Sequence, residues 1–100
     1  MEIRFKDDDL DRLETDPRFT AKLPDAVVSS YRRAINYIRQ ALDERDLRSK
    51  KSFHFEKVQG DRSGQHSLRL NLKWRMIVEL EGEPPSKVIV VCEVDNHYEG

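Results

Sequence analysis

Asp95 and His97 form a possible acid–base pair near the end of the sequence, directly after an apolar run. Residues two apart in an extended segment project on the same side, so we expect these side chains to share one surface. A carboxylate beside an imidazole fixes its tautomer or keeps it protonated, and histidine is suited to proton transfer near neutral pH. The alternative interpretation is that both residues only cap a strand end in solvent.

A series of basic residues precedes this pair. Residues 45–75 carry 9 basic and 3 acidic groups, although the whole chain has a net charge of -1. Cleavage of RNA through its 2′-hydroxyl needs a base, an acid and cations that stabilise the phosphate. The alternative is a solvated surface, or ion pairs with nearby carboxylates such as Glu79. The candidate cations are Lys57, Arg62, Arg69, Lys73 and Arg75.

Three aromatic residues permit more than one interpretation. His54 lies between two phenylalanines and is expected to face the cationic surface, as a second candidate for proton transfer. His66 alternates with leucines and is expected to be a core or edge histidine. Trp74 either stacks on a base or packs beneath a helix. No His or Cys spacing suits a metal, and no glycine-rich phosphate loop is present, so we expect no metal and no cofactor.

The length and composition predict one domain, residues 1–100. Charged residues make up 37% of the chain, yet aliphatic runs recur, which is typical of a folded domain. No apolar run approaches the roughly 18 residues of a membrane span. The acidic start does not resemble a signal peptide. Cys92 is the single cysteine, which excludes an internal disulfide and favours a reducing cytoplasm.

The hydrophobic pattern predicts helices first and strands afterwards. Ile3 and Phe5 indicate a short strand, residues 7–14 a short helix, and the segment after Pro24 a long helix. Residues 43–52 are expected to be irregular or a helical turn, and strands are expected at 53–58, 66–72, 74–80 and 87–94. This order predicts an α+β fold, with two N-terminal helices packed on a small antiparallel sheet. The long helix should bury Val27, Val28, Tyr31, Ala34, Ile35, Ile38 and Leu42.

Several ordered segments resemble motifs of the HigB-type toxins of the RelE/ParE superfamily. They are DLRS at 46–49, GDRSGQHS at 60–67, RLN at 69–71, WR at 74–75 and DNH at 95–97. The GQHS step and the arginine–asparagine spacing are most similar to GraT-like toxins. The resemblance covers essentially the whole chain, and it implies a RelE/ParE-like fold.

The resemblance also implies a function. These toxins belong to type II toxin–antitoxin systems and act as ribosome-dependent endoribonucleases, or mRNA interferases. A cognate helix-turn-helix antitoxin, HigA-like, holds them inactive, and operator DNA is bound only through that antitoxin. By resemblance, His97 and Asp95 occupy the terminal catalytic positions and Arg75 a phosphate-contact position. Glu56, four residues before the turn glycine Gly60, falls where members have a histidine or a glutamate.

Two positions depart from the family pattern. Asn96 replaces a tyrosine, and its amide can hydrogen-bond a phosphate but has no proton to transfer at neutral pH. Gln59 replaces a lysine of the family pattern, and Lys57 is close enough in the sequence to take the place of that lysine. These departures leave two alternatives to the nuclease: a weak or inactive homologue that binds antitoxin in an autoregulatory complex, and a ParE-like gyrase inhibitor.

Overall fold

The structure is a computed structural model that describes residues 1–58, 64–83 and 87–96. Helices precede most of the strands, as predicted. The elements in chain order are β1 (Glu2–Phe5), α1 (Asp8–Thr15), α2 (Asp25–Gln40), α3 (Glu44–Ser49), the 3₁₀ turn η1 (Lys51–Phe53), β2 (Glu56–Lys57), β3 (Gln65–Arg69), β4 (Trp74–Glu81) and β5 (Val88–Asn96).

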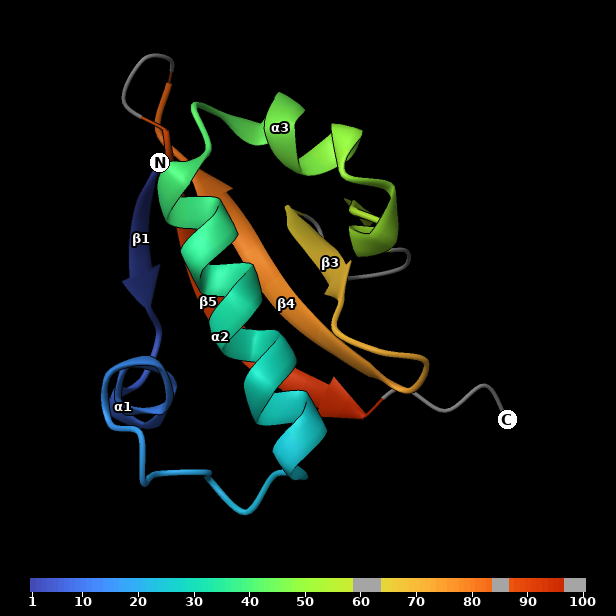
Figure 1. Cartoon of the computed structure of the whole chain (residues 1–100). Helices are drawn as coiled ribbons and strands as arrows, with labels where there is room; N and C mark the ends of the chain where they lie inside the picture. The colour runs from blue at the N-terminus through green and yellow to red at the C-terminus, as the bar shows by residue number, and fades with distance from the viewer. Residues whose placement is uncertain (59–63, 84–86, 97–100) are drawn as a thin grey trace.

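The strands form one sheet in the order β1-β5-β4-β3-β2 (Figure 1). The pairs β2–β3, β3–β4 and β4–β5 are antiparallel, whereas β1 pairs with β5 in parallel. The predicted α+β class is confirmed, but the sheet is mixed rather than antiparallel. The reason is that the first strand joins the last one, and the long chain between them provides the crossover that a parallel pair requires.

The first two helices begin in different ways. The Asp7 carboxylate accepts a hydrogen bond from the Leu10 N–H at 3.0 Å and so caps α1. Pro24 precedes α2, a position where its missing N–H costs nothing. On α2 the predicted apolar face is buried, from Val27 to Ile38.

Leu42 was predicted wrongly as part of this apolar face. The helix ends at Gln40, Ala41 is extended, and the Leu42 side chain is 88% exposed. The Leu42 N–H bonds to the Asp46 carboxylate at 2.8 Å, and Asp43 caps the next helix, α3. Side-chain capping therefore ends the helix before its hydrophobic period runs out.

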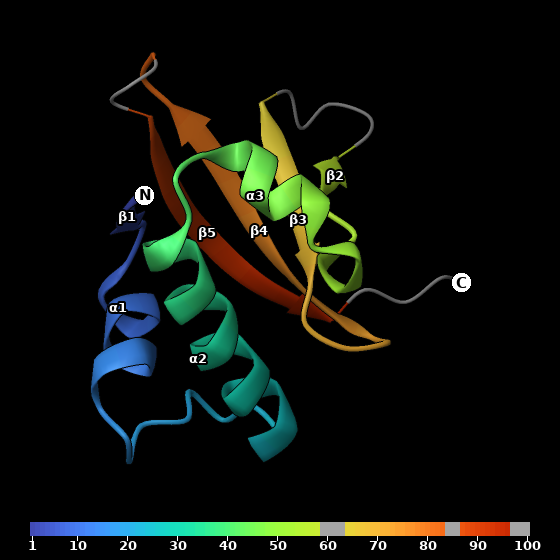
Figure 2. The ribbon, with the colours of Figure 1, turned by 45° about the horizontal axis from the view of Figure 1, so that its top comes forward.

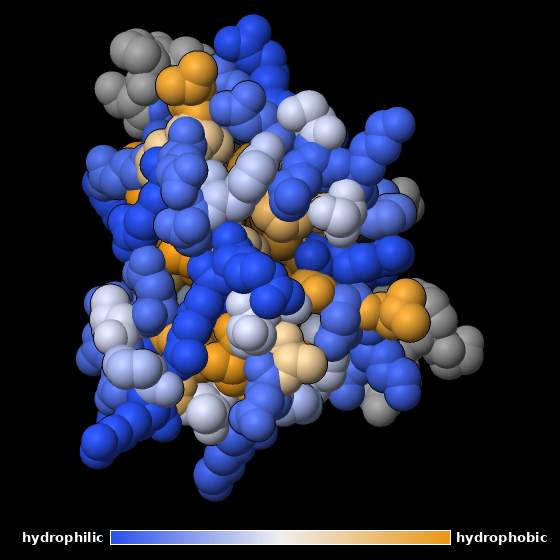
Figure 3. Space-filling view, viewed as in Figure 1, coloured by the Kyte–Doolittle hydropathy of each residue, from blue (hydrophilic) through white to orange (hydrophobic). Residues whose placement is uncertain are grey.

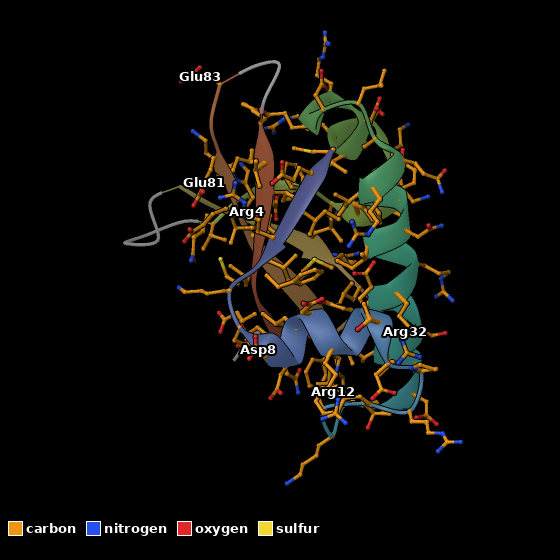
Figure 4. The ribbon with its side chains drawn as sticks, turned by 90° about the vertical axis from the view of Figure 1, so that its left-hand side faces the viewer. Arg4, Asp8, Arg12, Arg32, Glu81 and Glu83 are labelled. Atoms are coloured by element: carbon orange, nitrogen blue, oxygen red, sulfur yellow. The ribbon has the colours of Figure 1, made fainter. Side chains whose placement is uncertain are left out.

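The hydrophobic core lies between the helices and one face of the sheet. Seen from the β1 edge, α1 and α2 lie on one side, and no described helix covers the other side (Figure 4). The Tyr31 hydroxyl donates to the Leu10 carbonyl at 2.8 Å, which joins α2 to α1. The side chain of Arg32 extends from α2 and donates to the Leu13 carbonyl at 3.0 Å. Among the fully buried core residues are Leu13, Ile35, Ile38, Leu47, Leu68, Met76, Val78, Ile89 and Val91.

The segment from α3 to β4 differs from the predictions at two places. The strand predicted at 53–58 is reduced to Glu56–Lys57, because η1 includes Phe53 and His54 has a left-handed backbone with φ of 45°. Strand β3 ends at Arg69, and the Asn71 side chain accepts from the Trp74 N–H at 3.0 Å. This turn leaves Leu72 90% exposed, so its predicted place on a strand face is wrong.

Two further features are the state of Cys92 and the character of the described helices. Cys92 is buried without a disulfide, and burial raises the pKa of its thiol to about 11, with a smaller contribution from Glu79. Among the described helices, none combines the length and the apolar character that a membrane crossing requires.

Candidate functional site

Polar side chains line up across three strands on the sheet face that lacks helices. Arg75 of β4 is the register partner of Arg69 on β3 and of Asp95 on β5. The following residue of β4, Met76, belongs to the core, so alternation directs Arg75 to the opposite, helix-free face. Arg69, Arg75 and Asp95 therefore form one row across the sheet, which we call the arginine row.

Arg75 also contacts the strand beyond β3. Its Nη1 atom lies 3.4 Å from the Ser67 hydroxyl oxygen and 3.9 Å from the Glu56 carboxylate. Glu56 and Ser67 are register partners on β2 and β3, which explains why both reach the same guanidinium. The side chains of Arg75 and Glu56 are 30% and 63% exposed, so solvent and a ligand can reach them.

The arginine row has an electrostatic cost in the free protein. Arg69 and Arg75 stand directly opposite each other, and like charges in such a cross-strand pair repel. An anion bound between the two guanidinium groups would relieve this repulsion and accept charge-assisted hydrogen bonds. The row is therefore suited to a phosphate, and it also contains the carboxylate of Asp95, with Glu56 beside Arg75.

Comparison with known proteins identifies the family. A family model described as the RelE-like toxin HigB of type II toxin–antitoxin systems matches residues 3–97. The chain belongs to the HigB-like toxin family. It is thus the toxin of a type II system, a class of protein whose partner is an antitoxin.

A solved structure supports the fold of this HigB-like toxin. The YoeB/ParE toxin from Agrobacterium tumefaciens is similar with a TM-score of 0.61 and 20% identity, over 98% of this chain and 100% of that chain. At this identity the likeness concerns the architecture, and it confirms the predicted RelE/ParE-like fold. No curated protein matched the sequence.

Other candidate residues of the HigB-like toxin lie apart from the arginine row. Lys57 pairs with His66 in the sheet, so alternation places it on the face opposite Glu56. His54 is exposed at the end of η1, and no hydrogen bond or ion pair joins it to Arg75 in the described part of the chain. Lys73 lies in the turn between β3 and β4, where its N–H bonds to the Asn71 side chain at 2.9 Å.

The last residue of β5 occupies one of the positions at which the sequence departs from the family pattern. Asn96 is the register partner of Trp74, and its Oδ1 atom is buried without a hydrogen-bond partner among the described residues. Trp74 is half-buried and is not part of the main core, contrary to the packing alternative. The candidates His97 and Arg62 lie outside the described residues. In the sequence, His97 directly follows Asn96.

His66 is a structural residue, as predicted. Its side chain is buried, and its ring stacks on Phe55 with centroids 5.0 Å apart and an interplanar angle of 7°. Both ring nitrogens are buried without a partner in the described chain. Burial lowers the pKa of His66, and the nearby cations Arg48 and Lys57 lower it further. A histidine in this state is poorly suited to proton transfer with a substrate.

One residue of the site was missed by the sequence interpretation. Ser67 was not among the candidate site residues, yet it is 3% exposed and its hydroxyl contacts Arg75. The family step GQHS contains this serine, and that motif was the available signal. Among the described residues, no group of three His, Cys, Asp or Glu side chains is placed to hold a metal ion.

Proposed function

We propose that this HigB-like toxin is an endoribonuclease that cleaves messenger RNA on the ribosome. The observation that carries the proposal is the arginine row, with Arg69 and Arg75 opposed and Asp95 beside them on an open sheet face. Two guanidinium groups held by neighbouring strands can contact the phosphate oxygens and stabilise the charge that develops during attack.

The reaction is transfer of the phosphate to the adjacent ribose oxygen. The 2′-oxygen attacks phosphorus and loses its proton to a base, while the bond from phosphorus to the 5′-oxygen breaks. An acid gives a proton to the departing 5′-oxygen. The products are a 2′,3′-cyclic phosphate and a 5′-hydroxyl, so neither an oxidant nor a cofactor takes part.

His97 is proposed to transfer protons, with Asp95 orienting its imidazole. Asp95 belongs to the arginine row, and His97 follows it by two residues in the sequence. Glu56 or His54 assists. Glu56 is favoured because its carboxylate is 3.9 Å from the Arg75 guanidinium, whereas no hydrogen bond or ion pair joins His54 to Arg75 in the described chain.

Dependence on the ribosome follows from the openness of this face. Glu56 is mostly exposed, and no described helix closes the site over a substrate. Positioning of the reacting groups is worth several kcal/mol, and the ribosomal decoding site can supply it where the toxin does not. We also propose a cytoplasmic location and a HigA-like antitoxin, with operator DNA reached only through that antitoxin.

The test is cleavage of messages in a bacterial translation extract. The parent toxin is expected to truncate messages, and His97→Ala is expected to leave them intact. The control is Arg45→Gln, which changes an exposed cation of α3 that pairs with Asp43. Equal cleavage by parent and His97→Ala would remove His97 from the mechanism.

A non-catalytic toxin homologue is the second candidate, and Asn96 is the observation that favours it. This residue stands where the family has a tyrosine, and its amide cannot transfer a proton at neutral pH. Induction in bacteria separates the candidates. Growth arrest with RNA ends in frame with codons supports the nuclease, and unaffected growth supports an antitoxin-binding role. DNA damage without message loss would indicate gyrase inhibition.

A further inference from the structure

A cavity of about 440 Å³ lies on the helix side of the molecule, away from the helix-free face that carries Glu56 and Asp95. It lies between α2 and the segment that contains η1 and the end of β3. In Figure 3, hydrophilic side chains surround a small apolar area in this region. Its lining includes three cations, Arg33, Lys50 and Arg69, and no acidic residue.

These three cations lack carboxylate partners in the part of the chain that the structure describes. The Arg33 guanidinium donates only to the Ser30 hydroxyl, at 3.2 Å. Lys50 places its ammonium over two aromatic rings, 4.9 Å from the centroid of Tyr37 and 5.5 Å from that of Phe53. Neither interaction neutralises a positive charge, so the cavity keeps a positive potential.

Several cations elsewhere in the molecule have carboxylate partners. Arg39 bonds to Glu14 at 2.7 Å, and Arg48 bonds to Glu44 at 3.0 Å. Lys87 also pairs with Glu44. Cations that converge without acids around a cavity repel one another, and a bound anion would relieve that repulsion. A lining that contains cations and no acidic residue therefore favours an anion in this cavity.

The lining can hold a phosphate in a defined place. Tyr37 and Phe53 pack edge to face, with centroids 5.2 Å apart, and the Tyr37 hydroxyl donates to the Asp46 carbonyl at 3.2 Å. These contacts fix the aromatic wall on which Lys50 rests. Hydroxyl and amide side chains complete the lining with donors for phosphate and ribose oxygens: Ser30, Asn36, Gln40 and Ser52.

Arg69 connects this cavity to the arginine row. It lines the cavity and is also the register partner of Arg75. The edge strand β2 pairs with β3 only at His66 and Ser67, so Arg69 lies beyond the covered part of that edge. A chain of phosphates can pass around this edge of the sheet from Arg75 to the cavity. Figure 2 shows β2 beside one end of β3 only.

We propose that the cavity is a second phosphate-binding site for single-stranded RNA, which holds the backbone beside the nucleotides at the arginine row. The inference rests on the proposed function, because it takes RNA as the substrate. Arg33 and Lys50 are the new contacts, and Arg69, at the end of β3, lies between the two sites. These residues position the strand and do not take part in bond cleavage.

The test is the salt dependence of binding to a short single-stranded RNA of mixed sequence. The variant combines Arg33→Gln with Lys50→Gln. The matched control combines Lys6→Gln with Arg18→Gln, two exposed cations that do not line the cavity and whose loss changes the net charge equally. Circular dichroism and thermal unfolding confirm that both proteins are folded.

The cavity variant is expected to reduce the slope of log K against log salt by about 1.4, since each phosphate contact on a single strand contributes roughly 0.7. The affinity of the cavity variant at low salt should fall about tenfold or more. The control should show less than half of the change in slope and less than half of the change in affinity. Equal slopes for variant and control would overturn the proposal. The proposal would also be overturned if the cavity variant lost binding to polyglutamate but bound RNA as the parent does, because the cavity would then bind an acidic peptide.

The cleavage assay in the translation extract separates this inference from the proposed function. A parent toxin that cuts no message, together with reduced RNA binding by the cavity variant, would reject the nuclease and retain the phosphate site. Cleavage by the parent with the same salt slope in both variants would reject only the phosphate site.

Discussion

Arg75 is the residue at which the polar side chains of four strands meet. Its guanidinium contacts Ser67 and Glu56, and its register partners are Arg69 and Asp95. A planar guanidinium donates in a fixed fork that matches a phosphate, which an ammonium cannot reproduce. The chemistry proposed for this face therefore depends more on Arg75 than on any other described side chain.

We predict that Arg75→Gln lowers the rate of message cleavage by about a hundredfold, the usual effect of removing one donor to developing charge. Stability should change by less than about 1 kcal/mol, because the 3.9 Å pair with Glu56 is solvent-exposed on one side. Arg75→Lys should recover only a small part of the activity. A cleavage rate within about twofold of the parent's, in the same translation extract, would contradict the role of Arg75.

At the scale of single residues, the sequence predicted which residues belong to the site better than it predicted their contacts. The family motifs pointed to both Arg75 and Glu56, and the structure places their charged groups 3.9 Å apart. The contact of Ser67 with Arg75 depends on the register of β2, β3 and β4 together. Register is set by turns and pairing across the sheet, which local residue patterns do not specify.

At the scale of elements, the junction of α1 and α2 depends on one buried hydroxyl. Tyr31 is fully buried and donates to the Leu10 carbonyl at 2.8 Å. Burial raises the pKa of the Tyr31 hydroxyl, and the nearby carboxylates Glu14 and Asp11 raise it further. The group therefore stays protonated and acts as a permanent donor between the two helices.

We predict that Tyr31→Phe lowers the free energy of unfolding by about 1–2 kcal/mol, because the Leu10 carbonyl loses a buried donor while the packing is kept. Tyr37→Phe is the matched control, since that hydroxyl is only partly buried and bonds to Asp46 at 3.2 Å. Urea unfolding of the three proteins measures both effects. A loss as large in Tyr37→Phe as in Tyr31→Phe would show that burial of the hydroxyl is not what matters.

The helices and strands themselves were largely predictable, and two of the errors share one cause. The periodic apolar residues of α2 predicted a helix that includes Tyr31 and Ile38, but the same pattern wrongly included Leu42. Leu72 was likewise wrongly placed on a strand face, because the alternation of β3 was extended too far along the sequence. In both cases a short polar side chain, Asp46 or Asn71, bonds to the backbone and ends the element. A hydrophobic period alone does not reveal such bonds between side chain and backbone.

At the scale of the whole molecule, the basic segment 45–75 is distributed over both faces of the sheet. The arginine row occupies the helix-free face, and the cavity with Arg33 and Lys50 lies on the helix side. The separation of charge along the sequence predicted a cationic surface but not its division in two. Lys50 of this segment lies on the helix side beside Arg33 of α2, whereas β3 and β4 direct Arg69 and Arg75 to the helix-free face.

The stability of the whole fold should depend on pH through His66, which lies between the sheet edge and α3. The charged groups around it are Arg48 and Glu44 of α3, Lys57 of β2 and Lys87 before β5. Burial lowers the pKa of His66 below the 6.5 of an unfolded chain, and the cations outweigh Glu44. Below that pH the unfolded chain binds a proton that the folded protein does not, so acidification favours unfolding.

We predict that the free energy of unfolding falls as the pH is lowered from about 6.5 through the folded pKa of His66, by up to about 1.4 kcal/mol per pH unit. His66→Phe should remove this dependence, because it keeps a ring against Phe55 and eliminates both unpartnered nitrogens. It should also stabilise the protein at neutral pH by about 1 kcal/mol. His54→Gln, at an exposed histidine, should keep the parent's profile. Urea unfolding at several pH values decides the matter: a His66→Phe profile as steep as the parent's would place the acid sensitivity elsewhere in the fold.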